Sequence, residues 1–305
     1  MSVLVELPED HYSVSAFEGF TPVADFSAGT GRAMIWLSQI AYETRDNAKV
    51  QRIADAWRLT RVEPFVGTAR TFLPMSSTRG LIADRDGALI VAFMGTDPVV
   101  FANWLTNFNA AISPTDMHRG FEEAAGATWE RIGAEIARAH GAGRPVLIAG
   151  HSLGGALAVA TAERAMQEDK VRATSVYTYG MPRIGGLKFA QAYNRDLGPV
   201  TYRVVYGMDL VPTVPPTELG YSHVGRRLHC DRHGTFDAAD LDAVPGTEEP
   251  QPPGQLLATL GRGLADFVRG PLSPTTRTDL LGTIYGFLPP ALGDHLPDRY
   301  FTAFD

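Results

Sequence analysis

The residues with the clearest chemical potential lie in the segment 150–158, which reads GHSLGGALA. Ser152 stands in the pattern G-x-S-x-G, after an apolar run predicted to be a strand and before an alanine-rich run predicted to be a helix. A strand, a sharp turn and a helix in this order are typical of a nucleophile elbow, in which a strained turn presents the serine hydroxyl. Strand and helix nearly touch there, so Gly150 and Gly154 stand where side chains would clash. We predict that Ser152 is a nucleophile.

A serine hydroxyl is a poor nucleophile at neutral pH, so it needs a histidine base that an acid holds in the correct tautomer. After a nucleophile elbow, the acid and then the histidine follow the serine along the chain, each on a loop beyond a strand. Asp209 is the first acidic residue after a predicted strand at 201–206. We predict that Asp209 is the acid, with a turn-capping aspartate as the alternative.

Four of the eight histidines follow Ser152, namely His223, His229, His233 and His295. His295 lies in a loop-like segment near the C-terminus, and His223 lies at the start of a predicted strand. By residue type and position alone, these two are close rivals for the base. The run from His229 to His233 could suggest a metal site, but no second cluster of ligands accompanies it, so we predict a polar strand end.

The elements that must position these side chains alternate along the chain. We predict helices at 32–58, 119–140 and 186–195, and strands at 59–66, 80–94, 145–149, 171–179 and 201–206. The pair Asp86-Gly87 divides the second strand region into a hairpin. This alternation predicts an α/β class protein with an open, largely parallel sheet and an antiparallel edge near the N-terminus. We expect a single α/β-hydrolase domain over 1–305, with its site beyond the carboxyl ends of the strands.

Composition narrows the classes of function. The 305 residues are 45% hydrophobic and 20% charged, which is typical of a globular chain with a sizeable core. The net charge of −7 without a basic stripe argues against nucleic acid as a partner. The single cysteine, Cys230, fits a reducing compartment. The sequence shows neither a signal peptide nor the roughly 18 apolar residues of a transmembrane segment, so we expect a cytoplasmic location.

Further motifs resemble the class 3 lipases, the family of the filamentous-fungal triacylglycerol lipases and their bacterial and plant relatives. The resemblance is carried by the segments 91–96, 118–121, 150–158, 177–185, 204–212 and 223–225, by Pro215-Pro216, and by Asp294-His295 with Tyr300. These segments span roughly 30–230 and the last dozen residues. The Y-G-x-P-R-x-G and D-x-V-P motifs are far more specific than the elbow, and their order also matches the family.

The resemblance implies a role for each matching residue. Asp209 corresponds to the acid and His295 to the base of a Ser-Asp-His triad, while His223 corresponds to a structural histidine. The backbone N–H groups of Leu153 and Thr96 correspond to the oxyanion hole. Met94 stands where the family has an arginine, so an ion pair below the oxyanion loop is not expected. The implied activity is hydrolysis of lipid acyl esters through an acyl-enzyme intermediate, without a metal or an organic cofactor.

Two segments are candidates for contact with a lipid. Residues 97–112 form a candidate lid, which we expect to be a helix with one apolar face made of Val100, Phe101, Trp104, Leu105 and Phe108. The alternative is a core helix that packs permanently on the domain. Residues 231–288 form a helical and loop insertion before His295, and the leucine-rich part, 254–288, is a candidate lining of the acyl groove. A lid of this kind predicts transient contact with a lipid interface.

Two alternatives compete with lipid ester hydrolysis. The first keeps the scaffold and changes the acyl chemistry, as in a phospholipase A1, a feruloyl-type esterase or an acyltransferase. The second is a hydrolase-fold binding module without catalytic activity. The intact series Ser152, Asp209 and His295 argues against this second alternative.

Overall fold

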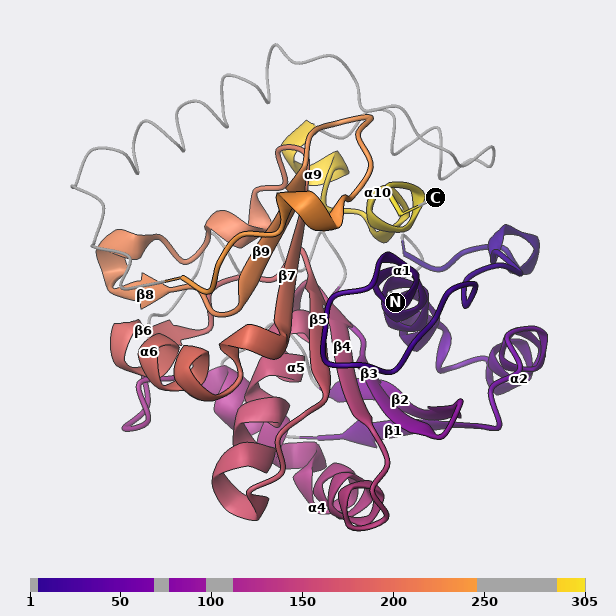
Figure 1. The fold of residues 1–305 in the computed structure, drawn as a ribbon, viewed down its shortest axis with the longest axis horizontal. Coiled ribbons are helices and arrows are strands. Elements are labelled where there is room, and N and C mark those ends of the chain that lie inside the picture. The colour runs from indigo at the N-terminus through magenta and orange to yellow at the C-terminus, as the bar shows by residue number, and fades with distance from the viewer. Residues whose placement is uncertain (1–4, 69–76, 97–111, 246–289, 305) are drawn as a thin grey trace.

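The computed structural model describes residues 5–68, 77–96, 112–245 and 290–304, which form a seven-stranded sheet in the order β1-β2-β3-β4-β5-β7-β9 (Figure 1). The strands are β1 (Arg61–Gly67), β2 (Thr78–Arg85), β3 (Ala88–Phe93), β4 (Val146–His151), β5 (Ser175–Tyr179), β7 (Thr201–Tyr206) and β9 (Arg226–Cys230). The pairs β1–β2 and β2–β3 are antiparallel, and the other neighbours are parallel. A second, two-stranded sheet pairs β6 (Gly185–Gly186) with β8 (Tyr221–Ser222). The prediction of a largely parallel sheet with an antiparallel edge is confirmed.

The antiparallel edge is a hairpin whose turn is set by two residues. Asp86 and Gly87 both have positive φ, at 49° and 79°, between β2 and β3. Such a pair matches the twist of the flanking strands and is favoured in two-residue hairpin loops. The hairpin predicted from this dipeptide is therefore confirmed.

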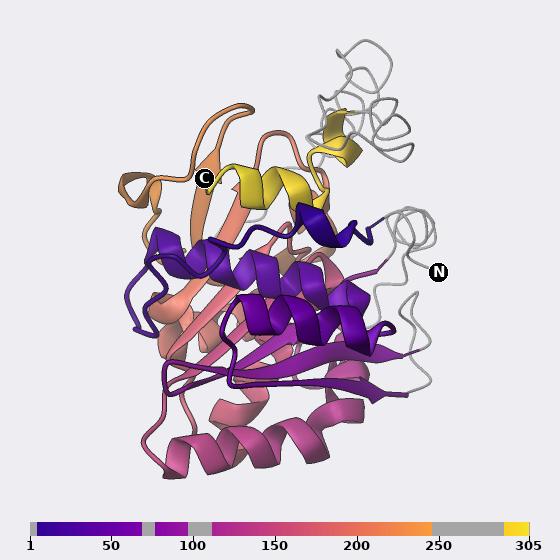
Figure 2. The ribbon, with the colours of Figure 1, turned by 90° about the vertical axis from the view of Figure 1, so that its right-hand side faces the viewer.

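Helices cover both faces of the sheet, which explains why β3 and β4 are buried along their whole length and mostly apolar. In β4, Val146 and Ile148 pack into one core, while Leu147 and Ala149 pack into the other. Figures 1 and 2 show one layer made of α1 (Ala28–Ile40), α2 (Asn47–Ala56) and α10 (Pro297–Thr302). The opposite layer consists of α4 (Arg119–Gly141), α5 (Leu153–Arg164) and α6 (Leu187–Asp196). The sheet therefore separates two cores.

The region 32–58, for which the pattern predicts one or two helices, contains two. Ser27 caps α1 by accepting from the Thr30 N–H, and Asp46 caps α2 by accepting from the Lys49 N–H. A short 3-10 turn, Ala41–Glu43, follows α1 directly. The second cap satisfies free N–H groups at a new helix start, so the chain begins a separate helix there.

The strand predicted at 171–179 begins only at Ser175. Val171 and Ala173 are buried, as the pattern suggests, but they lie in a connection rather than in the sheet. The Val171 N–H bonds the Ala165 carbonyl, and Thr174 Oγ1 accepts from the Val146 N–H. Burial without strand pairing is what an apolar pattern by itself cannot distinguish from a strand.

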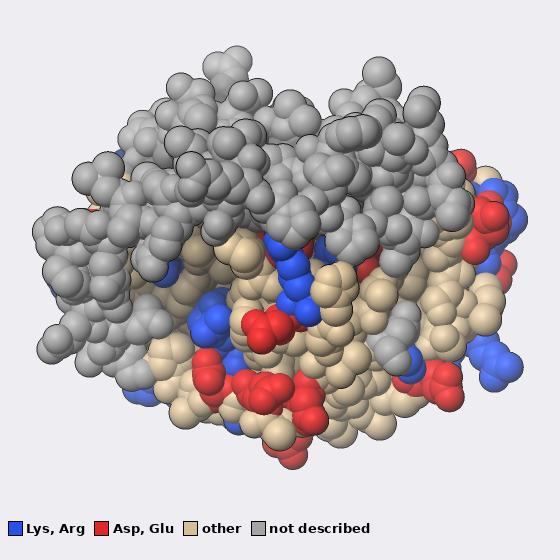
Figure 3. All heavy atoms as spheres, turned by 90° about the horizontal axis from the view of Figure 1, so that it is seen from above, with Lys and Arg blue, Asp and Glu red and all other residues tan. Residues whose placement is uncertain are grey.

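The candidate lid is outside the described residues except for Ile112, and so are its apolar residues. The same holds for the leucine-rich segment 254–288 and for most of the insertion 231–288. No described helix combines the length and the apolar composition needed to cross a membrane. On the face seen in Figure 3, acidic side chains gather toward the lower edge, with lysines and arginines scattered around them, in keeping with the net charge of −7.

Candidate active site

Ser152 sits at the junction of β4 and α5 in a conformation that few residues adopt. Its φ is 59° and its ψ is −130°, and its N–H donates to the Tyr179 carbonyl at 2.8 Å. A Cβ on Gly150 would lie 2.1 Å from the Gly154 carbonyl oxygen, and one on Gly154 would lie 2.5 Å from the Phe93 carbonyl oxygen. Both glycines are therefore sterically required, as the sequence predicted, and the turn stores the strain typical of functional sites.

The imidazole at Ser152 belongs to His295, which comes from the far end of the chain between α9 (Pro290–Gly293) and α10. His295 Nε2 lies 2.8 Å from Ser152 Oγ, and Nδ1 lies 2.9 Å from Asp209 Oδ2. In the neutral ring that fits both contacts, Nδ1–H donates to the carboxylate and Nε2 accepts from the serine hydroxyl. The ring is buried, with an exposed fraction of 3%. The three residues therefore form one continuous hydrogen-bonded chain.

Asp209 follows β7 and accepts two further hydrogen bonds. The Val211 N–H donates to Oδ1 at 2.8 Å, and the Tyr300 hydroxyl donates to Oδ2 at 2.5 Å. Burial holds the pKa of Tyr300 well above its ordinary value, with the charge of Asp209 as the second cause, so the phenol keeps its proton. These donors orient the carboxylate and stabilise its negative charge.

His223, the rival for the base, lies elsewhere. Its Nε2–H donates to the Pro212 carbonyl at 2.6 Å, and the side chain is buried. Burial lowers its pKa well below the ordinary value, and the charges of Arg203 and Arg183 add to this effect. The structure thus brings His295, and not His223, to Ser152. His229 and Cys230 lie at the end of β9, and the described residues hold no group of three or more side chains able to bind a metal ion.

The residues predicted to form the oxyanion hole lie beside the serine. Leu153 is the first residue of α5, so its N–H has no acceptor within the helix. The chain beyond β3 passes close by, because a Cβ on Gly95 would lie 3.0 Å from Ser152 Cβ. Next to it, Thr96 Oγ1 is buried and lacks a hydrogen-bond partner among the described residues. The Leu153 N–H and the segment that carries Thr96 therefore both lie next to Ser152.

Two buried residues that support His295, namely His151 and Tyr42, were not predicted from the sequence. His151 Nε2–H donates to the His295 carbonyl at 2.7 Å, and its Nδ1 accepts from the Tyr42 hydroxyl at 2.9 Å. Burial lowers the pKa of His151 well below the ordinary value, and the nearby His295 lowers it further, so the ring is neutral. His151 precedes Ser152 in the chain, and side chains of successive residues diverge along a strand, so no local pattern predicts that it supports the base.

Gly180 belongs to the Y-G-x-P motif and lies against both the acid and the base. Its φ is +58°, and a Cβ there would lie 2.6 Å from Asp209 Oδ2 and 2.8 Å from His295 Nδ1. Tyr300, to which the sequence assigns no role, is the donor to Asp209 described above. The Y-G-x-P motif marks the position of Gly180 in the sequence. The contacts of Gly180 are with Asp209 and His295, which lie far away along the chain, so the motif alone does not predict them.

Comparison with known proteins matches residues 90–219 to the model of the family described as lipase (class 3). The chain is 38% identical to secreted mono- and diacylglycerol lipase 1 of Fusarium solani over 42% of this chain and 40% of that protein. It is 28% identical to a triacylglycerol lipase of Arabidopsis thaliana over 90% of this chain and 64% of that protein. The chain therefore spans less than two thirds of the length of either relative.

A similar solved structure is that of a lipase from Rhizopus microsporus var. chinensis, with a TM-score of 0.57. At 22% identity, over 79% of this chain and 87% of that one, it shows a shared α/β-hydrolase fold. The family match begins within β3 and includes the elbow, the Y-G-x-P motif and Asp209. Motif order and fold agree with this match, and residues 90–219 of the chain match the class 3 lipase family.

Proposed function

We propose that this protein is a serine carboxyl-ester hydrolase. Ser152 Oγ attacks the ester carbonyl carbon while its proton passes to His295 Nε2. Asp209 holds the imidazole and stabilises its charged form. The negative oxygen of the tetrahedral intermediate is bound by the backbone N–H groups of Leu153 and Thr96, with help from the Thr96 hydroxyl. The observation that carries the proposal is the unbroken hydrogen-bonded chain Ser152–His295–Asp209 at a strained elbow.

The second half of the proposed reaction reverses the proton path. Protonated His295 gives its proton to the leaving alcohol oxygen as the carbon–oxygen bond breaks, which leaves the acyl group on Ser152 Oγ. A water molecule then loses a proton to His295 and attacks the acyl carbon. When the acid is released, the proton returns to Ser152. Every group in these steps belongs to the chain, the substrate or water.

We further propose that the substrate is a lipid acyl ester, such as a glyceride. The relatives from Fusarium solani and Arabidopsis thaliana are a mono- and diacylglycerol lipase and a triacylglycerol lipase, which supports this class. Met208, directly before the proposed acid, has an exposed fraction of 49%, so an apolar side chain lies at the surface near the site. Contact with a lipid interface through the candidate lid at 97–112 belongs to the same proposal.

The test combines a covalent probe with graded substrates. A fluorophosphonate should label the folded protein at Ser152, and Ser152→Ala should abolish labelling and lower kcat by about 10⁶-fold. Esters of p-nitrophenol with increasing acyl length, compared with a phospholipid and a feruloyl ester, then separate the acyl classes. Ester hydrolysis that persists in purified Ser152→Ala would refute the proposal.

A further inference from the structure

Asp294, the residue before the proposed base, is a buried carboxylate that the triad does not use. Its exposed fraction is 1%. Oδ2 accepts from the Met208 N–H at 2.8 Å, and Met208 directly precedes Asp209. Arg232 Nε donates to Oδ2 at 2.7 Å and to Oδ1 at 3.0 Å. A single side chain adjacent to the base thus binds the backbone adjacent to the acid.

The third segment at this point is the turn after β9, which carries Arg232. It is joined to the loop of the acid, because the Gly207 N–H donates to the Cys230 carbonyl at 2.9 Å and His229 Nε2–H donates to the Gly207 carbonyl at 3.0 Å. Gly207 has φ +52°, and a Cβ there would lie 2.5 Å from Asp294 Oδ2. Only glycine lets the carboxylate approach this closely. Three loops therefore converge on Asp294.

We propose that Asp294 and Arg232 form a carboxylate clamp that sets the position of His295 relative to Asp209. The inference rests on the proposed function, and both members are positioning residues because neither touches the reacting atoms. The acid and the base lie 86 residues apart. The triad contact, the Tyr300–Asp209 hydrogen bond and the clamp join the segments that carry them. The clamp lies outside the path of the proton. It keeps the distance between Asp209 and His295 constant while His295 gains and loses charge.

The two members of the clamp depend on each other electrostatically. Burial raises the pKa of Asp294, and the nearby charge of Asp209 adds to this, whereas the Met208 N–H and Arg232 oppose it. Without Arg232, a buried carboxylate beside a second carboxylate favours its protonated form. Asp294 then becomes a weaker acceptor for the Met208 N–H. Loss of either member should therefore have the same consequence.

The test uses Asp294→Asn, Arg232→Met and the double variant, assayed on a short soluble p-nitrophenyl ester. Each single variant should lower kcat by about 10- to 100-fold with KM within about twofold, because geometry rather than binding is lost. The double variant should be no worse than either single variant, as for two parts of one unit. Arg232→Lys keeps a charged donor and should recover most of the loss. Arg52→Met, which removes an exposed ion pair with Glu9, is the control and should leave kcat unchanged.

A second readout separates this inference from the proposed function. Hydrogen exchange of the Met208 amide should be slow in the wild type and faster in Asp294→Asn and Arg232→Met, at equal global stability. Wild-type kcat in both single variants, additive losses in the double variant, or unchanged Met208 exchange would each overturn the clamp. A wild-type protein that cleaves no ester would refute the proposed function, and Met208 exchange would still decide whether the clamp holds the acid loop. If Asp294→Asn fails to fold, the comparison of Arg232→Met with Arg232→Lys tests the clamp: a loss of kcat in the first that the second recovers supports it, and wild-type kcat in both overturns it.

Discussion

At the scale of single residues, the site depends on two imidazoles that have different environments. The rings of His151 and His295 lie with their centroids 4.7 Å apart. His151 is held neutral by burial, and it donates to the backbone of His295 rather than competing for the serine proton. His295 can therefore take up a proton without a second positive charge beside it. The neutral ring supports the base, and the base faces the hydroxyl.

Gly180 gives the sharpest prediction at this scale. Gly180→Ala would place a Cβ within 2.6 Å of Asp209 Oδ2 and 2.8 Å of His295 Nδ1, at a positive φ that also disfavours alanine. The acid and the base must then separate, so we expect kcat for ester hydrolysis to fall by about 10²-fold or more, since small misplacements of catalytic groups have large effects. Steady-state kinetics on a soluble ester measures this change.

The matched control for this substitution is Gly87→Ala in the β2–β3 turn. Gly87 also has a positive φ, +79°, but a Cβ there meets nothing within 4 Å. Gly87→Ala should lower the stability of the fold by a similar amount, because alanine disfavours the positive φ, and it should leave kcat unchanged. Equal loss of kcat in the two variants would show that strain, and not the clash with the triad, is responsible.

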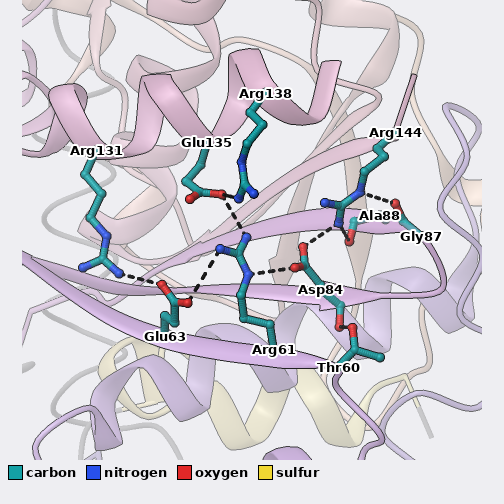
Figure 4. Close-up of polar contacts among 10 residues, drawn as sticks. All are labelled: Thr60, Arg61, Glu63, Asp84, Gly87, Ala88, Arg131, Glu135, Arg138 and Arg144. Atoms are coloured by element: carbon teal, nitrogen blue, oxygen red, sulfur yellow. Dashed lines mark hydrogen bonds and ion pairs between the residues drawn. The ribbon is translucent and has the colours of Figure 1, made fainter. Parts of the chain in front are cut away.

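At the scale of elements, an ion-pair network ties the antiparallel edge of the sheet to α4. Arg61 of β1 bonds Asp84 of β2 at 2.7 Å and Glu135 of α4 at 2.9 Å (Figure 4). Arg144 reaches the other oxygen of Asp84 at 2.6 Å. The hydrogen bond from Arg61 lowers the pKa of Glu135 in spite of the desolvation of that carboxyl. The network joins the strand pair β1–β2 to α4, which lies later in the sequence.

We predict that Arg61→Met lowers the free energy of unfolding by about 1–2 kcal/mol, because partly buried charge-assisted hydrogen bonds are lost. Chemical denaturation at low and high salt measures the change, which should shrink at high salt. Arg52→Met, which removes the exposed ion pair between Arg52 and Glu9, should lower the free energy of unfolding by less. Activity should be unaffected, because β1 lies three strands away from β4 in the sheet. A loss of kcat with unchanged stability would contradict this assignment.

At the scale of the whole molecule, two neutral buried histidines couple stability to pH. Burial keeps the folded-state pKa values of His151 and His223 well below the ordinary value of 6.5. The unfolded chain therefore binds protons near pH 6 that the folded chain does not. Stability is fully present above that pH and falls as the pH decreases, by up to about 1.4 kcal/mol per pH unit for each histidine.

His223→Asn isolates one of these contributions and keeps a side-chain donor for the Pro212 carbonyl. The free energy of unfolding, measured by denaturant titration between pH 5 and 6, should depend less steeply on pH in this variant than in the wild type, by up to about 1.4 kcal/mol per pH unit. Buried carboxyls with raised pKa values, such as Asp294, act in the opposite direction but are common to both proteins. His140→Asn, at an exposed position, should leave the slope unchanged. Identical slopes for all three proteins would refute the coupling.

Several elements of the fold are predictable from interactions between residues that are close in the sequence. The elbow, the Asp86-Gly87 hairpin and the mostly apolar strands β3 and β4 follow from sterics and from burial of both sheet faces, and each depends on neighbouring residues. The misplaced strand start before Ser175 marks the limit, since buried loop residues carry the same apolar pattern.

The fold class, the position of the elbow and the order of the acidic and histidine candidates after it follow from residue patterns along the chain. By residue type and position alone, His223 and His295 are close rivals, and only the family resemblance favours His295. Packing places His223 on the Pro212 carbonyl and His295 at the serine. Packing likewise decides the contacts of Gly180 and Asp294, which join loops far apart along the chain. Distances between such loops are set by how the sheet and helices pack, and no local pattern encodes them.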